Sequence, residues 1–258
     1  MHRRPQIVGT AALALCAYAD LTAAEETPAE TQYERPAGAV LFFWTRHGQT
    51  GSPDITDLGR TQARLLAGRL RKMGFNGVVY ASPYKRTVAT ADVIAGELGT
   101  VVYLAPAIQE VLKHPEHMAK RTGPTIEDFR LKYTHIAPDA TLPIPWWATQ
   151  KEDRDIVFAR VAPFLDELIK TADRDVLLVG HAATVGAMSR YFGKRAKRVG
   201  PRGTGGNWNC AFNAVQIEPA EKTILALNDT SHLAYDQTTK NKLTKADWER
   251  KQLEKSQE

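Results

Sequence analysis

The chain alternates short, continuously apolar runs with longer stretches in which apolar residues recur at helical spacing. The first run, residues 40–44 (VLFFW), has the β-branched and aromatic composition of a strand that is buried on both faces. Similar runs predict further strands at residues 77–81, 100–104, 175–180, 210–217 and 223–227.

Helices are predicted between these strands. The spacing predicts helices over residues 57–73, 82–98, 151–171 and 182–192, and a charged terminal helix over residues 242–258. Ser82 and Pro83 suit the N-cap and first position of the second helix, whereas Pro163 is expected to kink or divide the third. Because strands alternate with helices across short turns, the sequence predicts an α/β fold, a three-layer sandwich on a mostly parallel central sheet.

Residues 111–150 lack a clear period, and so long an irregular segment is typical of a lid or a binding loop. We therefore expect a small cap insertion over the ends of the strands. Trp146 and Trp147 within it suit either a stacking platform for a substrate or the packing of the cap itself. His114 and His117 have a spacing that metal ligands use, but the absence of a convincing third ligand disfavours a metal site.

The composition is that of a soluble globular protein, with 43% hydrophobic and 24% charged residues among 258. The net charge of +5 is modest, and the two signs are interspersed. The basic block at residues 194–202 lacks the interleaved aromatic residues of a nucleic-acid-binding stripe, so we expect a solvated loop there and no nucleic-acid partner.

The first residues have the pattern of a targeting segment. A basic start at residues 2–4 precedes an apolar stretch, residues 7–19, that is too short to cross a membrane. We interpret residues 1–24 as a signal peptide of a secreted or periplasmic protein, with no stable membrane insertion after cleavage; a mitochondrial presequence is the alternative. Cleavage would remove Cys16 and leave Cys210 without an internal disulfide partner. The rest of the chain is predicted to comprise a disordered lead-in at residues 25–38, one domain at residues 39–234 and a charged C-terminal tail at residues 235–258.

Ionisable residues follow several of the predicted strands at the point where each strand ends. Arg46 and His47 come directly after the first strand, Arg86 follows the second, and His181 follows the fourth. Glu110 comes a few residues after the third strand. Because the carboxyl ends of parallel strands lie along one edge of a sheet, one site would collect two guanidinium groups, two imidazoles and a carboxyl group.

That set of groups suits phosphoryl transfer through a covalent histidine intermediate. A neutral imidazole nitrogen is a competent nucleophile, and arginine donates bidentately to phosphoryl oxygens while it stays charged. A second, protonated histidine would help to stabilise the charge of the transition state. A carboxylic acid can protonate the leaving alkoxide and then act as a base toward water. No metal ion is required, because side chains supply the positive charge.

The motifs that contain these residues resemble those of the histidine phosphatase superfamily, whose members have the phosphoglycerate-mutase-like fold. The resemblance covers roughly residues 40–233 and keeps the order and spacing of the motifs. The motifs are Arg46-His47-Gly48, Thr56…Gly59…Gln62-Ala63, Ser82-Pro83…Arg86-Thr87…Thr90-Ala91 and Val179-Gly180-His181.

The resemblance implies that His47 is the phosphorylated nucleophile and that His181 hydrogen-bonds the phosphoryl group. Glu110 would be the proton donor, with Asp54 and Glu116 as rival carboxylates.

The same resemblance assigns the binding of the phosphate to Arg46 and Arg86. Members of the family often place a small polar side chain on the phosphate shortly after the first motif. In this chain Thr50 and Ser52 are the candidates for that position.

The segment after Glu110 favours a phosphatase over a mutase. In the mutase branch an extended Arg-His-Tyr-Gly-type motif follows the acid, and residues 111–114 do not match it. We therefore expect a phosphoric monoester hydrolase that needs neither cofactor nor metal, with a small phosphorylated substrate as its partner. The natural substrate and the oligomeric state stay open. The alternatives are a phosphoglycerate-type mutase, which would need a bisphosphorylated cofactor, and a non-catalytic phospholigand-binding protein of the same fold.

Overall fold

The computed structural model describes residues 33–51, 54–117, 123–194, 196–199, 207–239 and 244–256. The predicted signal peptide and the candidate Ser52 lie outside these residues and stay predictions. The strands are β1 (Val40–Arg46), β2 (Gly77–Ala81), β3 (Val102–Leu104), β4 (Asp175–Gly180), β5 (Lys197–Arg198), β6 (Phe212–Ile217) and β7 (Lys222–Asp229). The helices are α1 (Asp57–Lys72), α2 (Lys85–Leu98), α3 (Ile126–Lys132), α4 (Arg154–Thr171), α5 (Ala182–Gly193) and α6 (Lys245–Ser256), with 3-10 turns η1 (Pro106–Ile108), η2 (Pro115–His117) and η3 (Tyr235–Gln237).

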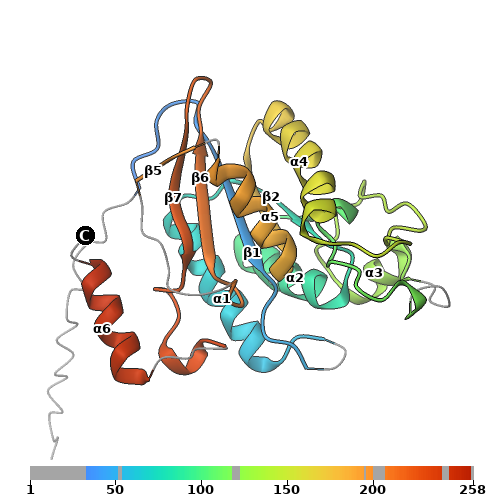
Figure 1. Cartoon of the computed structure of the whole chain (residues 1–258), viewed down its shortest axis with the longest axis horizontal. Coiled ribbons are helices and arrows are strands. Elements are labelled where there is room, and N and C mark those ends of the chain that lie inside the picture. The colour runs from blue at the N-terminus through green and yellow to red at the C-terminus, as the bar shows by residue number, and fades with distance from the viewer. Residues whose placement is uncertain are drawn as a thin grey trace, which may run out of the picture. The chain divides into compact units, whose positions relative to one another are not determined.

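One sheet runs through the described residues in the order β3-β2-β4-β1-β6-β7-β5 (Figure 1). Strands β3, β2, β4 and β1 are parallel neighbours, whereas β6 is antiparallel to both β1 and β7. Parallel neighbours need crossover connections, and the helices α1, α2 and α4 lie in these crossovers. The mostly parallel sheet confirms the predicted α/β fold and places the carboxyl ends of its parallel strands along one edge.

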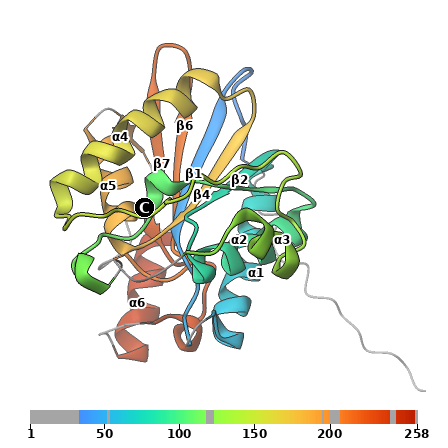
Figure 2. The same cartoon turned by 90° about the vertical axis from the view of Figure 1, so that its right-hand side faces the viewer.

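Strand β1 is covered on both faces, which explains its unbroken apolar sequence. Leu41 and Phe43 pack in a core with α1 and α2, and Phe42 and Trp44 pack in a second core with α4 and α5. Figure 2 shows these two pairs of helices on opposite sides of the sheet. These four side chains of β1 are all buried, so this strand lies at the centre of a three-layer sandwich.

Two helices differ from the sequence-based prediction. Helix α2 begins one residue after Tyr84, which occupies the N-cap, so the prediction that Ser82 caps this helix is wrong. The Ser82 side chain contacts a buried histidine instead. Helix α4 begins behind an Asp153 N-cap and is not divided at Pro163, which lies at an exposed position within it.

The basic block at residues 194–202 was expected to be a loop. Within it, Lys197 and Arg198 form the edge strand β5, which pairs in parallel with β7. Both residues of β5 are exposed, so the predicted solvation holds although the predicted loop does not.

The segment at residues 111–150 holds more regular structure than expected. Helix α3 begins with a reciprocal capping box, in which Thr125 accepts from the N–H of Asp128 and the Asp128 carboxylate accepts from the N–H of Thr125. Phe129 and Tyr133 bring this helix into the core of α1 and α2. A helix of seven residues offers too few apolar positions for a period to be recognised, which explains why the pattern missed it.

The end of the predicted disordered lead-in is docked on the domain. The Arg35 guanidinium donates to both carboxylate oxygens of Asp175, at 3.0 and 2.8 Å, at the start of β4. The same carboxylate accepts from the N–H groups of Leu41 and Asn76, at 2.9 and 3.0 Å. The ion pair ties the end of the lead-in to a buried acid at the base of the sheet, which needs such partners; the disorder of residues 25–38 stays a prediction.

The C-terminal tail contains helix α6, which is shorter than predicted. It starts after Thr244, whose hydroxyl accepts from the N–H of Asp247 at 3.2 Å. Trp248 of α6 contacts Tyr235 of η3, with ring centroids 6.0 Å apart. Among the described residues, no helix is both long and apolar enough to cross a membrane.

Replacing Arg35 with alanine should lower the free energy of unfolding by about 2 kcal/mol, because the buried Asp175 carboxylate loses its charged partner but keeps two N–H donors. Urea denaturation would measure the change. The matched control is Arg174→Ala, which removes an exposed ion pair with Asp173 and should leave stability unchanged. Equal stability of the Arg35→Ala variant and the native chain would contradict the role assigned to this ion pair.

Candidate active site

The carboxyl end of β1 is held by main-chain hydrogen bonds on both sides. The N–H of His47 donates to the Gly180 carbonyl at the end of β4 (3.0 Å), and the N–H of Cys210 donates to the Arg46 carbonyl (2.9 Å). The side-chain amide of Asn209 donates to the His47 carbonyl. The hydrogen-bond ladder thus continues one residue beyond β1 and fixes the main chain of His47.

The His47 side chain is buried, with 4% of the residue exposed. Its Nδ1 lies 2.8 Å from the carbonyl oxygen of Gly48. Because a carbonyl oxygen only accepts hydrogen bonds, Nδ1 carries the ring proton, and Nε2 carries the lone pair of the neutral imidazole. Nε2 is therefore the nucleophilic nitrogen of this histidine.

A tight contact between two glycines holds the turn that follows β1. A Cβ on Gly48 would lie 2.6 Å from the Gly59 carbonyl oxygen, and a Cβ on Gly59 would lie 2.3 Å from the Gln49 carbonyl oxygen. The N–H of Gln49 donates to the buried side chain of Gln62 on α1 (2.8 Å), and the N–H of Gly48 donates to Thr90 Oγ1 on α2 (3.0 Å). The motifs on α1 and α2 thus support the first motif.

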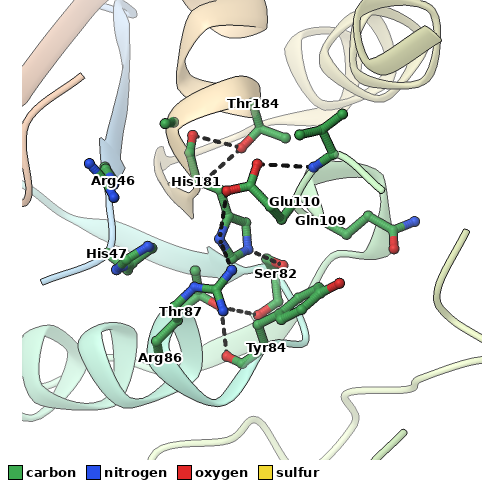
Figure 3. A network of polar contacts seen from close by, with 12 residues as sticks. Arg46, His47, Ser82, Tyr84, Arg86, Thr87, Gln109, Glu110, His181 and Thr184 are labelled. Carbon is green, nitrogen blue, oxygen red and sulfur yellow. Dashed lines mark hydrogen bonds and ion pairs between the residues drawn. The ribbon is translucent and has the colours of Figure 1, made fainter. Parts of the chain in front are cut away.

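His181 lies at the end of β4, is fully buried and faces His47, with ring centroids 5.4 Å apart (Figure 3). Its main-chain N–H donates to Thr184 Oγ1 (2.8 Å), which fixes the start of α5. Its Nδ1 lies 3.1 Å from Arg86 Nη2, and since a guanidinium only donates, Nδ1 is the acceptor. The ring proton is therefore on Nε2, which donates to Ser82 Oγ at 2.9 Å.

Arg86 lies in the first turn of α2, as predicted, and its guanidinium stands over the ring of Tyr84, 4.8 Å from the ring centroid. The Tyr84 ring also contacts His181 and Trp146, at centroid distances of 5.0 and 5.3 Å. Trp146 is 5% exposed, and its Nε1 donates to the Pro124 carbonyl (3.1 Å). Of the two alternatives left open for this tryptophan, the structure therefore shows packing of the cap.

Glu110 reaches the same place from the turn after β3. Its Oε2 lies 3.8 Å from His181 Nδ1, and its Oε1 accepts from the N–H of Val111 (2.9 Å). The side chain is 28% exposed, so the carboxyl group is accessible to solvent beside a buried imidazole. The side chains that the structure brings together at this edge of the sheet are those of Arg46, His47, Arg86, Glu110 and His181 (Figure 3).

The rival carboxylates have other partners. Asp54 forms an ion pair with Lys132 Nζ (2.6 Å), and Glu116 pairs with His114 Nδ1 (3.0 Å) at an exposed position. Thr50 is exposed and forms an isolated bridge within its own turn, so its contact with a phosphate stays a prediction. Within the described part of the chain, no group of three or more His, Cys, Asp or Glu side chains is arranged to hold a metal ion.

Burial and repulsion between like charges shape the electrostatics of the site. Desolvation lowers the pKa of both Arg46 and Arg86, and the nearby Glu110 carboxylate counteracts this effect. Desolvation lowers the pKa of His181 well below its ordinary value, and the charges of Arg86, of His47 when it is protonated, and of Arg46 act in the same direction. His181 is therefore neutral here, and the protonated form that the sequence analysis assumed requires an anion beside it.

Some of the contacts that support the site have no signal in the sequence. Arg46 Nη1 donates to the Asn207 carbonyl (3.2 Å), and the Asn207 side chain donates to the Ala182 carbonyl at the start of α5. Ser82 was recognised as a helix cap and not as the partner of His181. An asparagine that follows a glycine-rich stretch of sequence carries no signal for such a role.

Comparisons with known proteins identify the family and agree with the fold. The family model described as the histidine phosphatase superfamily (branch 1) matches residues 43–230, and the chain belongs to that superfamily. The ecdysone phosphate phosphatase of Bombix mori, solved in complex with tungstate, is 20% identical with a TM-score of 0.56, covering 74% of this chain and 93% of that one. A mycobacterial glucosyl-3-phosphoglycerate phosphatase is 23% identical with a TM-score of 0.51, covering 74% and 100%. These two structures share the fold, and no curated protein sequence matches the chain.

Binding of a dianion should be coupled to proton uptake by His181, because the anion offsets the positive charges that lower the pKa of this histidine. Sulfate is a suitable probe, since it does not titrate near neutral pH. Its affinity should fall as the pH rises, by at most about tenfold per pH unit for one proton taken up. Calorimetry in two buffers of different ionisation enthalpy measures the uptake.

Proton uptake should vanish in a His181→Gln variant and persist in His135→Gln, whose histidine pairs with Asp92 on α2. Sulfate binding by the native chain without proton uptake would contradict the electrostatic argument. Uptake that persists in His181→Gln would assign the proton to another group.

Proposed function

We propose that this chain is a phosphomonoesterase that hydrolyses a small phosphorylated substrate through a phosphohistidine at His47, without a metal ion. The observation that carries the proposal is the tautomer of this buried histidine. Its Nδ1 is committed to the Gly48 carbonyl, so Nε2 is nucleophilic beside the guanidinium groups of Arg46 and Arg86. Membership of the histidine phosphatase superfamily supports the proposal, and both structural neighbours named above are phosphatases.

In the first step His47 Nε2 attacks phosphorus, the N–P bond forms, and the P–O bond to the leaving group breaks. The carboxylic acid form of Glu110 gives its proton to the departing oxygen, so the leaving group departs as a neutral alcohol. The guanidinium groups of Arg46 and Arg86 bind the non-bridging oxygens, where planar donors match the phosphoryl geometry.

In the second step water attacks the phosphorus of the phosphohistidine. The Glu110 carboxylate takes a proton from this water, the N–P bond breaks, and its electron pair returns to His47 Nε2. Inorganic phosphate then leaves, and both residues have regained their starting protonation states. The partial exposure of Glu110 fits this step, because the attacking water has to reach the carboxylate from solvent.

Side chains supply the positive charge that metal ions provide in many phosphoryl-transfer enzymes. Arg46 Nε is buried and has no hydrogen-bond partner within the described residues, so it is a donor that a phosphoryl oxygen would satisfy. His181 gains a proton beside the bound dianion and donates from Nδ1, while its Nε2–H keeps the hydrogen bond to Ser82.

Replacing His47 with alanine should lower kcat/KM for p-nitrophenyl phosphate by about 10³-fold or more, because the covalent route is lost. Rapid acid-free quenching of the native enzyme with labelled substrate should trap an acid-labile, base-stable phosphoryl group at His47. The control is His114→Ala, a variant of an exposed histidine that should keep full activity. A fully active His47→Ala enzyme would overturn the mechanism.

Removal of divalent metal ions should leave the reaction unchanged, because arginine and histidine side chains carry the charge-stabilising role. The measurement is p-nitrophenyl phosphate hydrolysis after extended dialysis against EDTA, compared with the same enzyme after dialysis against buffer. Loss of activity that added Zn²⁺ or Mg²⁺ restores would show that the cationic side chains are not sufficient.

A further inference from the structure

Arg160, in the middle of α4, hydrogen-bonds to the main chain that leads to Glu110. Its Nη1 donates to the carbonyl of Ala107, and its Nη2 lies 2.8 Å from the carbonyl oxygen of Gln109 and 3.4 Å from that of Glu110. Three carbonyls around the end of η1 thus converge on one planar guanidinium. Only a fork with several fixed donors can contact such a set at the same time.

The same guanidinium forms a two-point ion pair with Glu152, at 2.7 Å from Nε to Oε1 and 3.1 Å from Nη2 to Oε2. The Glu152 side chain is 5% exposed and that of Arg160 is 19% exposed, so the pair is shielded from water. Glu152 also holds Leu112, because its Oε2 accepts from the N–H of Leu112 and its own N–H donates to the Leu112 carbonyl (3.0 and 2.7 Å). We call Arg160 and Glu152 together the clamp.

The clamp therefore fixes the main chain on both sides of the side chain of Glu110. Arg160 holds the residues before it, and Glu152 holds Leu112, two residues after it. Between these points the N–H of Val111 donates to Glu110 Oε1, so the carboxyl orientation follows from the position of this short segment. The other oxygen, Oε2, is then directed to His181 Nδ1, 3.8 Å away.

We propose that Arg160 is a positioning residue for the proton-transfer step and that it acts by holding the main chain of Glu110 in place. This inference rests on the proposed role of Glu110 as the proton donor. Neither residue of the clamp touches the five side chains of the site through a hydrogen bond between side chains among the described residues. The clamp acts through main-chain groups, namely the carbonyls that Arg160 contacts and the N–H and carbonyl of Leu112, so its geometry matters and not its charge alone.

The test compares two substrates of similar shape that differ in their need for a proton donor. p-Nitrophenolate is a stable anion that leaves without help, whereas the phenolate of phenyl phosphate is much more basic and needs the acid. The quantity measured is kcat/KM, which reports the steps up to and including transfer of the phosphoryl group to His47. A displaced acid should therefore lower kcat/KM for phenyl phosphate selectively.

Arg160→Lys is the principal variant, because it keeps the positive charge opposite Glu152 and removes the fork. It should lower kcat/KM for phenyl phosphate by about tenfold or more and that for p-nitrophenyl phosphate by less than about threefold. Glu152→Gln, which loosens the clamp from its other side, should show a selective loss in the same direction. Arg154→Lys is the matched control, an exposed arginine at the start of the same helix that should change neither value.

Glu110→Gln serves as the reference for full loss of the acid, and adding Arg160→Lys to it should cause no further selective loss. If Glu110→Gln lowers kcat/KM selectively for phenyl phosphate and Arg160→Lys does not, the clamp proposal is overturned, whereas the proposed role of Glu110 stands. If Arg160→Lys lowers kcat/KM equally for both substrates, with or without lower thermal stability, the clamp proposal is likewise overturned, because such a loss reflects a merely structural role. If Glu110→Gln itself lowers kcat/KM equally for both substrates, the assignment of Glu110 as proton donor fails, and the clamp proposal fails with it.

Discussion

The hydrogen-bond register of β1, β4 and β2 determines where the reactive groups lie. Arg46 is paired with Gly180, and Ala81 with Val179, so the residues that follow these pairs emerge next to one another. Those residues are His47, His181 and Ser82. A slip of one residue would turn each side chain to the opposite face of the sheet. The two cores that bury Phe43 and Trp44 on opposite faces of β1 prevent such a slip. The packing of the interior therefore also fixes the geometry of the site.

The site also brings several basic side chains together where they are largely shielded from solvent. Two guanidinium groups and two imidazoles face a single carboxylate, and that carboxylate is partly exposed. The neutral state of His181 limits the repulsion, and Ser82 is a suitable partner because a hydroxyl group can either accept or donate. The electrostatic energy of the site therefore falls when a doubly negative group binds, and the proposed phosphate ester is such a group.

The sequence predicted the features that depend on short-range pattern. The apolar runs located the central strands, and Arg46, His47, Arg86 and His181 were recognisable because they end a strand or follow one closely. The seven-residue α3 and the two-residue β5 were too short for a period to show. The pairing of Ser82 with His181 spans 99 residues, and the contact of Arg160 with Gln109 spans 51. Such contacts depend on how elements pack together, and no local propensity encodes them.

The contact between Gly48 and Gly59 makes the arrangement of the nucleophile dependent on the docking of α1 against β1. Neither position has room for a Cβ, so the turn after His47 can keep this conformation only because both residues are glycines and the helix is docked closely against it. The position of His47 is therefore a property of the packed domain and not of the motif alone. A compact state with native strands and helices but loose packing would contain all five side chains of the site and still lack their arrangement.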